Sequence, residues 1–472
     1  MKEKIYLIGF PLERYTQPML GLGYVGASLL KEGHEIKLHD VISKAPGDPD
    51  FIEKEVKEFA PAYVGISAMT PQIQRAMEIL GRIKKVNSEI ITVMGGPHAS
   101  SLPEYTLKTL NNLDYVITGE GEETFPSLIR SHSGDVVRES IYGLVYRKDG
   151  KIVSNKPKFV SDIDTLEYPW KIMNPLNYNK GELQGYTCKR RPVVTVVSTR
   201  GCPYLCTYCA QSSIFVNKLR VRNALKFVDE IEYLHREFGI NEIQLADDNF
   251  AFHREHVVSV CNEIIKRGLD VSWALINGVR ADRLDEDLLK LMKKAGCYYM
   301  AFGIEFGSER MLKICRKSLK VEKAYENIRI ASRLGYITHG FFLMGYPVEK
   351  EEDMEATKKL IMSLPLDRIS IGMPVPYPGS DLFNYYMEKK FKSLDNIDWS
   401  YFIEGKFKPI WEYVTGDYVS AQINTTYKKF YSSPARLLRF ISKLTTLEQY
   451  KATFMGFRRG LLNLMNRIET QK

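Results

Sequence analysis

Short apolar runs alternate with amphipathic segments through the first 140 residues of the chain. Each run has the length of a buried strand, and the segments between the runs have helical periodicity. The first helical segment ends at Gly33, a residue type that commonly terminates helices. Strands that alternate with helices at this spacing predict an α/β fold with a Rossmann-like, doubly wound parallel sheet. The five predicted strands are residues 4–9, 36–40, 63–67, 90–94 and 115–118.

The same alternation returns later in the chain, where six apolar runs are separated by amphipathic helical segments. Six strand–helix units in succession predict a partial (β/α)6 barrel that stays open on one side. The predicted strands of this barrel are residues 193–198, 242–246, 271–275, 299–305, 339–345 and 368–373.

These patterns divide the chain into four predicted parts. We expect a Rossmann-like domain over residues 1–140, a linker over 141–192, the partial barrel over 193–395 and a helical carboxyl-terminal region over 396–472. The linker contains a predicted hairpin, whose turn is Lys148-Asp-Gly150.

Composition and charge narrow the functional classes. The chain has 472 residues, of which 44% are hydrophobic and 26% charged, as in globular proteins with two or three domains. It has no apolar run that could span a bilayer and no secretory leader, so we expect a cytoplasmic location. Residues 421–472 carry ten Lys or Arg against two Glu, which accounts for nearly all of the net charge of +9. Since the rest of the chain, residues 1–420, is close to neutral, nucleic acid is not an expected partner.

The basic carboxyl-terminal segment contains two stretches with an apolar stripe edged by Arg and Lys. In the first stretch, Ser433 can cap a helix that has Pro434 in its first turn. Basic amphipathic helices either lie on anionic membranes or pack against their own domain. The sequence leaves both alternatives open, so a peripheral position at the membrane surface is one of the two expectations.

Three of the seven cysteines lie within eight residues, in the run Cys202-Pro-Tyr-Leu-Cys206-Thr-Tyr-Cys209. An odd number of cysteines is a poor disulfide framework. Three thiolates at this spacing can bind three irons of a cubane and leave the fourth iron open. A zinc site normally requires a fourth ligand, and the sequence offers no second cysteine pair. The run therefore predicts a [4Fe–4S] cluster.

Polar residues follow the predicted barrel strands, at the edge where βα barrels hold their active sites. These candidate site residues are Asp247, Asp248, Arg280, Glu305 and Gly345.

The strands of the first sheet also end in candidate ligand-binding residues, because ligands of such sheets lie beyond the carboxyl ends of the strands. Glycines there allow close approach of the backbone to a ligand. The sequence lacks G-x-G-x-x-G after the first strand, so a nicotinamide or flavin dinucleotide is not expected. The candidates at this edge are Met69, Thr70, Gly95, Gly96, Gly119 and Glu120.

Taken together, these motifs resemble the radical S-adenosylmethionine (SAM) enzymes that carry a cobalamin-binding domain. The C-x3-C-x2-C run, with Tyr208 before its last cysteine, is similar to the radical SAM signature. The ordered segments 18–24, 33–35, 95–98 and 114–122 are similar to the cobalamin-binding domain of class B methyltransferases and anaerobic cyclases. A domain of this type that has lost its cofactor is the alternative interpretation.

The resemblance implies roles for the candidate residues. Asp247 or Asp248 would face the SAM amino group, Glu305 would contact the ribose and amino groups, and Gly345 would turn over the adenine. No D-x-H-x-x-G stretch, the usual source of a histidine ligand to cobalt, is present. By resemblance, the corrin would lie base-off between the two domains. Met69 and Thr70 would lie near its lower face, and His98 is interpreted as a packing residue.

The resemblance also implies a function. A 5′-deoxyadenosyl radical would activate a C–H bond, with C-methylation through methylcobalamin of a hydrophobic or lipid-like small molecule as the leading hypothesis. Ring-forming or oxidative radical chemistry is the alternative. A tRNA-modifying methylthiotransferase would carry further cysteines before Cys188, which the chain lacks, and an RNA-binding protein is a remote alternative. A low-potential donor such as ferredoxin or flavodoxin would supply electrons. The sequence assigns no catalytic side chain beyond the cofactor-binding residues.

Overall fold

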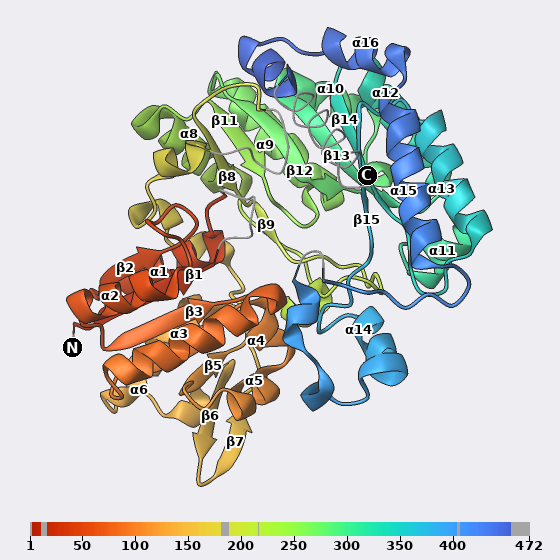
Figure 1. Ribbon diagram of the computed structural model, residues 1–472. Helices are drawn as coiled ribbons and strands as arrows, with labels where there is room; N and C mark the ends of the chain where they lie inside the picture. Colours follow the sequence, from red (N-terminus) through yellow and green to blue (C-terminus); the bar gives the residue numbers. More distant parts are fainter. Residues whose placement is uncertain (1, 11–16, 181–187, 216, 404–405, 455–472) are drawn as a thin grey trace.

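Two α/β sheets from consecutive parts of the chain make up the structure, with helices of the last part packed on the second sheet (Figure 1). This computed structural model describes residues 2–10, 17–180, 188–215, 217–403 and 406–454. The predicted fold class, a Rossmann-like sheet followed by a six-stranded partial barrel and carboxyl-terminal helices, is confirmed.

The first sheet has seven strands in the order β2-β1-β3-β4-β5-β6-β7. The first five strands of this order are parallel, as predicted. The predicted hairpin forms β6 and β7, and it extends the first sheet through antiparallel pairing with β5. The strands are β1 (Lys4–Gly9), β2 (Glu35–His39), β3 (Tyr63–Ser67), β4 (Ile91–Gly95), β5 (Tyr115–Ile117), β6 (Leu144–Lys148) and β7 (Lys151–Ser154).

Helices cover both faces of this sheet because successive residues of its strands point to opposite sides. In β1, Tyr6 and Ile8 belong to the core under α2 and α3, whereas Ile5 and Leu7 belong to the core under α1 and α6. Between β4 and β5 the chain forms two short helices, the first of which begins at Pro97. The helices are α1 (Leu20–Lys31), α2 (Pro49–Phe59), α3 (Ile73–Val86), α4 (Pro97–Ser101), α5 (Pro103–Thr109) and α6 (Gly121–His132).

The second sheet has six parallel strands in the order β15-β14-β13-β12-β11-β8, which leaves β8 and β15 as its two edges. A separate two-stranded ribbon, β9 with β10, follows β8 directly. The strands are β8 (Val193–Val196), β9 (Thr199–Arg200), β10 (Arg220–Val221), β11 (Glu242–Leu245), β12 (Ser272–Val279), β13 (Cys297–Glu305), β14 (Ile337–Leu343) and β15 (Arg368–Gly372).

The helices that follow these strands lie outside the curved sheet (Figure 1). They are α7 (Gln211–Ile214), α8 (Ala224–Phe238), α9 (Arg254–Lys266), α10 (Glu286–Lys294), α11 (Glu309–Ile314), α12 (Val321–Arg333), α13 (Glu351–Ser363) and α14 (Asp381–Tyr386), and the carboxyl-terminal helices are α15 (Gly416–Tyr431) and α16 (Pro434–Ser442).

Helix α16 closes the amino-terminal pole of the barrel. Phe440 and Leu444 are buried with Val193 and Ile337, the first residues of β8 and β14. Ser433 precedes the helix and Pro434 occupies its first turn as predicted, but the Ser433 side chain makes no capping hydrogen bond. The second predicted amphipathic stretch lies almost entirely outside the described residues.

The basic side chains of α16 point into the protein. Lys443 Nζ lies 2.6 Å from Asp367 Oδ2, Arg439 Nε lies 3.1 Å from Asp367 Oδ1, and Arg436 donates to the carbonyl of Leu364. Asp367 is completely buried and also accepts hydrogen bonds from the backbone and hydroxyl of Thr338. Among the described residues, no helix is both long and apolar enough to cross a membrane.

We expect Asp367→Asn to detach α16 from the barrel. The substitution leaves the buried ammonium of Lys443 without its counter-charge, and breaking a buried pair in this way costs about 3–5 kcal/mol. Thermal unfolding and limited proteolysis near α16 measure this effect. Asp395→Asn, at an exposed position, is the control and should leave both unchanged. Equal behaviour of the two variants would show that Asp367 does not anchor the helix.

Candidate functional site

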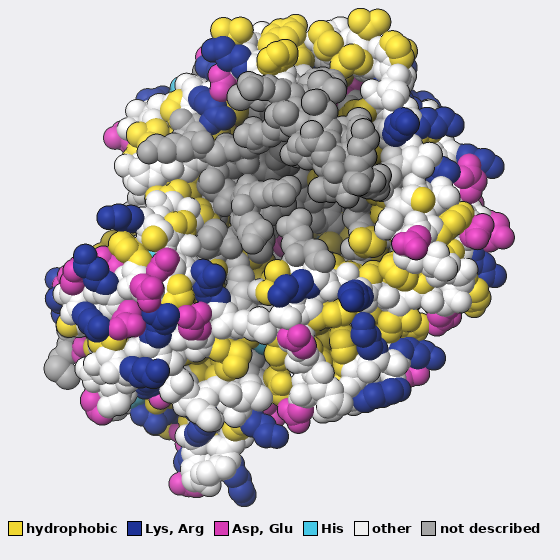
Figure 2. Space-filling model, viewed as in Figure 1, with side chains coloured by type: hydrophobic (Ala, Val, Ile, Leu, Met, Phe, Trp, Pro, Cys, Tyr) yellow, Lys and Arg dark blue, Asp and Glu magenta, His cyan; other side chains and the backbone are white. Residues whose placement is uncertain are grey.

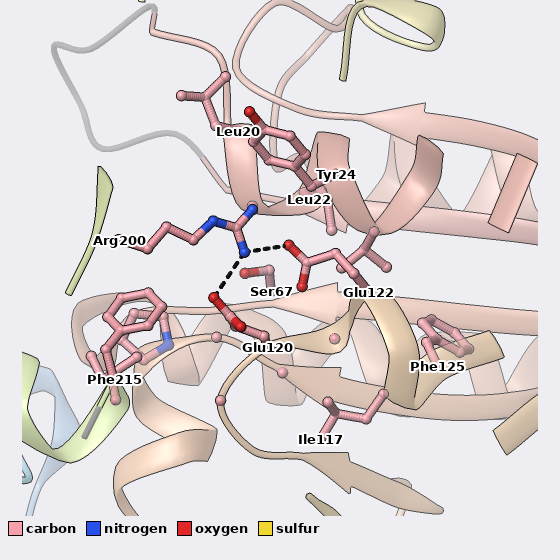
Figure 3. Close-up of a pocket in the computed structure, with 18 of the residues that line it drawn as sticks. Leu20, Leu22, Tyr24, Ser67, Ile117, Glu120, Glu122, Phe125, Arg200 and Phe215 are labelled. Atoms are coloured by element: carbon pink, nitrogen blue, oxygen red, sulfur yellow. Dashed lines mark hydrogen bonds and ion pairs between the residues drawn. The ribbon is translucent and has the colours of Figure 1, made fainter. Parts of the chain in front are cut away.

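A cavity of about 370 Å³ lies at the carboxyl edge of the first sheet, between α1, α6 and the start of the barrel (Figure 3). Its walls are mainly apolar and include Val93, Ile117 and Phe125. Residues of the second part of the chain, including Arg200 and Phe215, close it on the barrel side. Of the residues predicted at this edge, Gly95, Gly96, Gly119 and Glu120 line the cavity.

Gly96, which lines this cavity, has a backbone geometry that requires glycine. Gly96 has φ +89°, and a Cβ there would lie 2.8 Å from Ser67 Oγ and 2.9 Å from the backbone nitrogen of Ala68. No other residue type fits this position without displacement of the β3 end. A narrow apolar slot with a few polar atoms at a strand edge fits the flat nucleotide end of a cobalamin, and thus the residues present suit that group.

Met69, Thr70 and His98 do not line the cavity. The hydroxyl of Thr70 lies 3.2 Å from His98 Nδ1, and the ring of His98 packs edge-on against Trp399 at 4.9 Å between centroids. Burial lowers the pKa of His98 to about 4, so its ring is neutral at physiological pH. The expected packing role of His98, which lies in α4, is confirmed.

Buried charges connect the two sheets across this cavity. Glu120 and Glu122 begin α6, and Arg200 lies on β9 of the second part of the chain. Arg200 Nη1 lies 2.9 Å from Glu120 Oε1 and 2.8 Å from Glu122 Oε1, and its guanidinium sits over the ring of Tyr24 (Figure 3). Arg220 Nη1 on β10 lies 2.6 Å from Glu120 Oε2. We call Glu120, Glu122, Arg200 and Arg220 the interdomain clamp.

The clamp leads directly into the cysteine run. Gly201 follows Arg200 with φ +92°, and a Cβ there would lie 2.4 Å from the carbonyl oxygen of Lys218. The turn therefore requires glycine, and it delivers Cys202 immediately after the clamped ribbon. Only Gly201 separates the clamped Arg200 from Cys202, so the position of the cysteine run is tied to the amino-terminal domain.

The three cysteines of the run are free thiols and partly exposed. Asn249 Nδ2 lies 3.8 Å from Cys202 Sγ, and Thr207 in the run donates its backbone N–H to the carbonyl of Cys315. Within the described ranges, no three His, Cys, Asp or Glu side chains converge on one point as a single metal ion requires. A cubane, which takes each cysteine on a different iron, needs no such convergence, so Cys202, Cys206 and Cys209 fit a [4Fe–4S] cluster.

The two predicted aspartates differ in their surroundings. Asp247 is buried, and its carboxylate accepts hydrogen bonds from the backbone of Ser198 (2.7 Å), the hydroxyl of Ser198 (2.6 Å) and the hydroxyl of Thr199 (3.0 Å). Burial raises its pKa to about 6. Asp248 lines the cavity and accepts a hydrogen bond from the backbone of Gly201. Asp247 therefore fixes the chain after β8, and Asp248 is the one of the two aspartates that lines the cavity.

Arg280 and Glu305 are engaged with neighbouring residues. Arg280 pairs with Asp282 at 2.9 Å, donates to the carbonyl of Lys317 and stacks on the ring of Tyr204 at 4.0 Å. Glu305 ends β13 with φ +70° and lies 2.9 Å from Lys317 Nζ. The structure thus assigns Arg280 to holding the loop of Tyr204, and it adds Lys317 as a buried cation that the sequence did not single out.

Gly345 lies in a turn that Glu349 organises. The backbone N–H groups of Gly345 and Tyr346 donate to Glu349 Oε2 at 2.6 and 3.0 Å. Burial raises the pKa of Glu349 to about 8. Trp411 and Val419 pack over the glycine, where a Cβ would lie 3.1 and 3.0 Å from them. Glu349 and Arg200 carry no sequence signal except proximity to a predicted motif, and Glu122 belongs to the segment 114–122 but was not singled out as a site residue.

We expect Glu120→Gln to weaken the clamp most strongly near neutral pH. Burial raises the pKa of Glu120, but Arg220 and Arg200 outweigh it, so the pKa lies below its ordinary value. The clamp's stabilisation is therefore complete above the unfolded pKa of about 4.3 and is lost as pH falls through the lower folded pKa. Urea unfolding at pH 7 should show a loss of about 3–5 kcal/mol, because buried arginines lose a partner.

The difference in free energy of unfolding between Glu120→Gln and wild type should decrease below about pH 4. Glu139→Gln, in an exposed pair with Lys148, is the matched control and should have little effect at any pH. A Glu120→Gln variant as stable as this control would contradict the clamp.

The sequence matches the radical SAM superfamily over residues 196–361 and the B12 binding domain over residues 14–129. It is 30% identical over 429 residues to an uncharacterized methyltransferase of Pyrococcus horikoshii, with 90% of each chain covered. It is also 30% identical over 345 residues to the anaerobic magnesium-protoporphyrin IX monomethyl ester cyclase of Rubrivivax gelatinosus, with 72% of this chain and 61% of the cyclase covered.

The fold is similar to that of the radical SAM methyltransferase TsrM from Kitasatospora setae, a structure with cobalamin and a [4Fe–4S] cluster bound. The TM-score is 0.69 at 18% identity, over 82% of this chain and 75% of TsrM, and this likeness concerns the fold. Both matched regions coincide with the two sites described above, the cavity of the first sheet and the cysteine run. The chain belongs to the radical SAM enzymes that carry a cobalamin-binding domain.

Proposed function

We propose that this enzyme methylates an unactivated carbon of a hydrophobic small molecule. The observation that carries the proposal is the direct connection between the two sites: Asp248 both lines the cavity and binds Gly201 at the start of the cysteine run. Two reactive groups held at one junction can act on one substrate in succession. The Pyrococcus horikoshii relative, matched over 90% of its length, is described as a methyltransferase, which supports methyl transfer.

The residues of this chain have distinct parts in that proposal. When bound, the cluster, SAM and cobalamin supply the radical and the methyl carrier that side chains cannot provide. Cys202, Cys206 and Cys209 would hold the cluster, and the cavity with Gly95, Gly96 and Gly119 would hold the cobalamin. Asp248 would face the ligand, while Asp247 keeps the strand end rigid.

Ring formation is the alternative radical outcome, and the match to the Rubrivivax gelatinosus cyclase favours it. That relative's name also supports a hydrophobic substrate class, because it acts on a tetrapyrrole ester. Methyl transfer and ring formation differ in the fate of the SAM methyl group, and isotopic labelling therefore separates them.

The test is anaerobic reconstitution followed by turnover with SAM that carries a CD3 methyl group. Candidate substrates are a tetrapyrrole ester and an isoprenoid lipid, analysed by mass spectrometry. A product that gains CD3, together with 5′-deoxyadenosine, is the expected result. A product that loses hydrogen without gaining CD3 would overturn methyl transfer in favour of ring formation.

Cys206→Ala should reduce iron content and 5′-deoxyadenosine to background. Cys261→Ala, at a buried cysteine of α9 outside the run, is the matched control and should keep both.

We also propose that the enzyme associates peripherally with membranes through an apolar ridge on and after α16. Leu438 is 68% exposed, Leu447 68% and Phe454 71%. Hydrophobic side chains gather at the top of the molecule over this region, whereas charges of both signs mix over the amino-terminal domain (Figure 2). Arg436, Arg439 and Lys443 contact the barrel, so the described part of this region offers a bilayer mainly apolar side chains, with Lys451 as an exposed cation beside them.

The ridge should bind phosphatidylcholine vesicles with little dependence on anionic lipid. Leu438→Asp with Leu447→Asp should weaken vesicle binding at least tenfold in a co-sedimentation assay, because each buried leucine contributes about 1.5–3 kcal/mol. Leu225→Asp, at a leucine of α8 that is 52% exposed, is the control and should bind as wild type does. Equal binding by both variants would contradict the proposal.

A further inference from the structure

The inner face of the second sheet carries polar side chains that the site described above does not use. In β8 and β11, Val194 and Ile243 belong to the core under the outer helices, so their neighbours Thr195 and Gln244 point to the interior of the partial barrel. Thr195 and Gln244 are paired across these two strands. They therefore lie side by side on one wall of the interior.

This wall has polar atoms that the described residues leave unsatisfied. Thr195 is 2% exposed and Gln244 is 0% exposed. Neither Thr195 Oγ1 nor Gln244 Oε1 has a hydrogen-bond partner among the residues that the structure describes. A buried polar atom without a partner lowers the stability of a fold. Because an amide oxygen can only accept, the group that satisfies Gln244 Oε1 must donate an O–H or an N–H.

A hydrogen-bonded chain lies at the other end of the same sheet. Tyr299 of β13 and His339 of β14 are buried, and the hydroxyl of Tyr299 lies 2.6 Å from His339 Nδ1. His339 Nε2 lies 2.9 Å from the hydroxyl of Ser370 on β15. Ser370 is exposed, so the chain ends in an accessible hydroxyl. A serine held by a histidine that a third side chain orients can donate to a ligand or accept from it.

This chain is uncharged. Burial, together with Arg368 two residues before Ser370, lowers the pKa of His339 well below its ordinary value, so the ring is neutral. Burial raises the pKa of Tyr299, so its phenol keeps its proton. Arg368 pairs in register with His339 and disfavours a cationic ligand there. Neutral donors and acceptors of this kind suit a hydroxyl group.

Apolar side chains separate the two polar walls. Ala274, Ile276 and Ala301 are packed together on the inner face of β12 and β13, the middle strands of the sheet. Since the sheet curves into a partial barrel, β8 with β11 and β14 with β15 stand on opposite sides of its interior (Figure 1). An apolar floor between two hydrogen-bonding walls is complementary to an apolar molecule with polar ends.

We propose that the inner face of the second sheet selects an uncharged substrate that has a hydroxyl group at each end of an apolar body. Ser370 contacts one hydroxyl, and His339 with Tyr299 positions Ser370. The other hydroxyl donates to Gln244 Oε1 and pairs with Thr195. The inference rests on the proposed function, because it names the class of molecule on which the radical would act.

The test uses the reconstituted holoenzyme and probes that share one hydrocarbon body: octane-1,8-diol, its dimethyl ether and octanedioate. Calorimetric titration should show that the diol binds at least about tenfold more tightly than the ether, which cannot donate a hydrogen bond. Equal binding of diol and ether, or no binding of the diol, would overturn the proposal. Tighter binding of octanedioate than of the diol would overturn it in favour of an anionic substrate.

Ser370→Ala should weaken binding of the diol about fivefold and leave binding of the ether within about twofold, because one hydroxyl contact is lost. Ser133→Ala, at an exposed serine of the first domain, is the matched control and should bind both probes as wild type does. Tyr299→Phe should reduce the preference for diol over ether by a smaller factor, since His339 loses the group that orients it. An unchanged preference in Ser370→Ala would contradict the contact.

Gln244→Met separates a ligand contact from a structural role. It should weaken binding of the diol about fivefold, yet unfold at the same or a higher urea concentration than wild type, because it removes an unpaired buried acceptor. Gln72→Met is the control, since the amide of Gln72 donates to Phe10 and accepts from Met69, both at 2.9 Å. This control should unfold at lower urea. Equal loss of stability in both variants would show that Gln244 is satisfied within the fold, which would overturn its role.

The inference and the proposed function fail separately. If CD3 reaches a product while diol and ether bind equally, the substrate class is wrong and methyl transfer stands. If the diol preference depends on Ser370 and Gln244 but CD3 reaches no product, the recognition stands and methyl transfer is wrong.

Discussion

The relative position of the two sheets depends on a buried ion-pair network, the interdomain clamp. Charges removed from water are costly unless each is paired and hydrogen-bonded. Glu120 meets that condition by accepting from Arg200, Arg220 and the backbone of Val160. Since β9 continues through Gly201 into Cys202, the clamp also fixes where the cysteine run stands relative to the cavity. Fixed charges at the domain boundary thus position the cysteine run relative to the cavity.

Around this clamp, several polar side chains at strand ends hydrogen-bond to neighbouring residues. Few polar side chains there can therefore contact a ligand. Asp247 and Arg280 direct their hydrogen bonds to neighbouring backbone or side chains, and Glu349 binds the backbone of its turn through Oε2. Asp248 differs because one side of it reaches the cavity. A rigid supporting shell with few open groups is the arrangement that holds large cofactors in a fixed geometry.

Much of this organisation could be predicted from the sequence. The apolar run at residues 4–9 predicted the buried strand β1, and cysteine spacing indicated the cluster. Partners could not be predicted in the same way, because periodicity specifies a face and not the residue that meets it. Nothing in the sequence indicates that Arg200 pairs with Glu120, which lies 80 positions earlier in the chain. For the same reason the sequence left open whether the basic residues near α16 face a membrane or their own domain, because it does not show that the buried Asp367 accepts Arg439 and Lys443.

Helix α16 seals the amino-terminal pole of the barrel, whereas the cysteine run and the cavity lie at the carboxyl ends of the strands. If the enzyme bound a membrane through this pole, its cysteine run and its cavity would face the aqueous phase. The bilayer would then act as an anchorage and not as the compartment from which substrate enters directly. A membrane-borne substrate would have to travel around the barrel or arrive on a carrier, so the length of that route, and not lipid solubility alone, would limit which molecules reach the site.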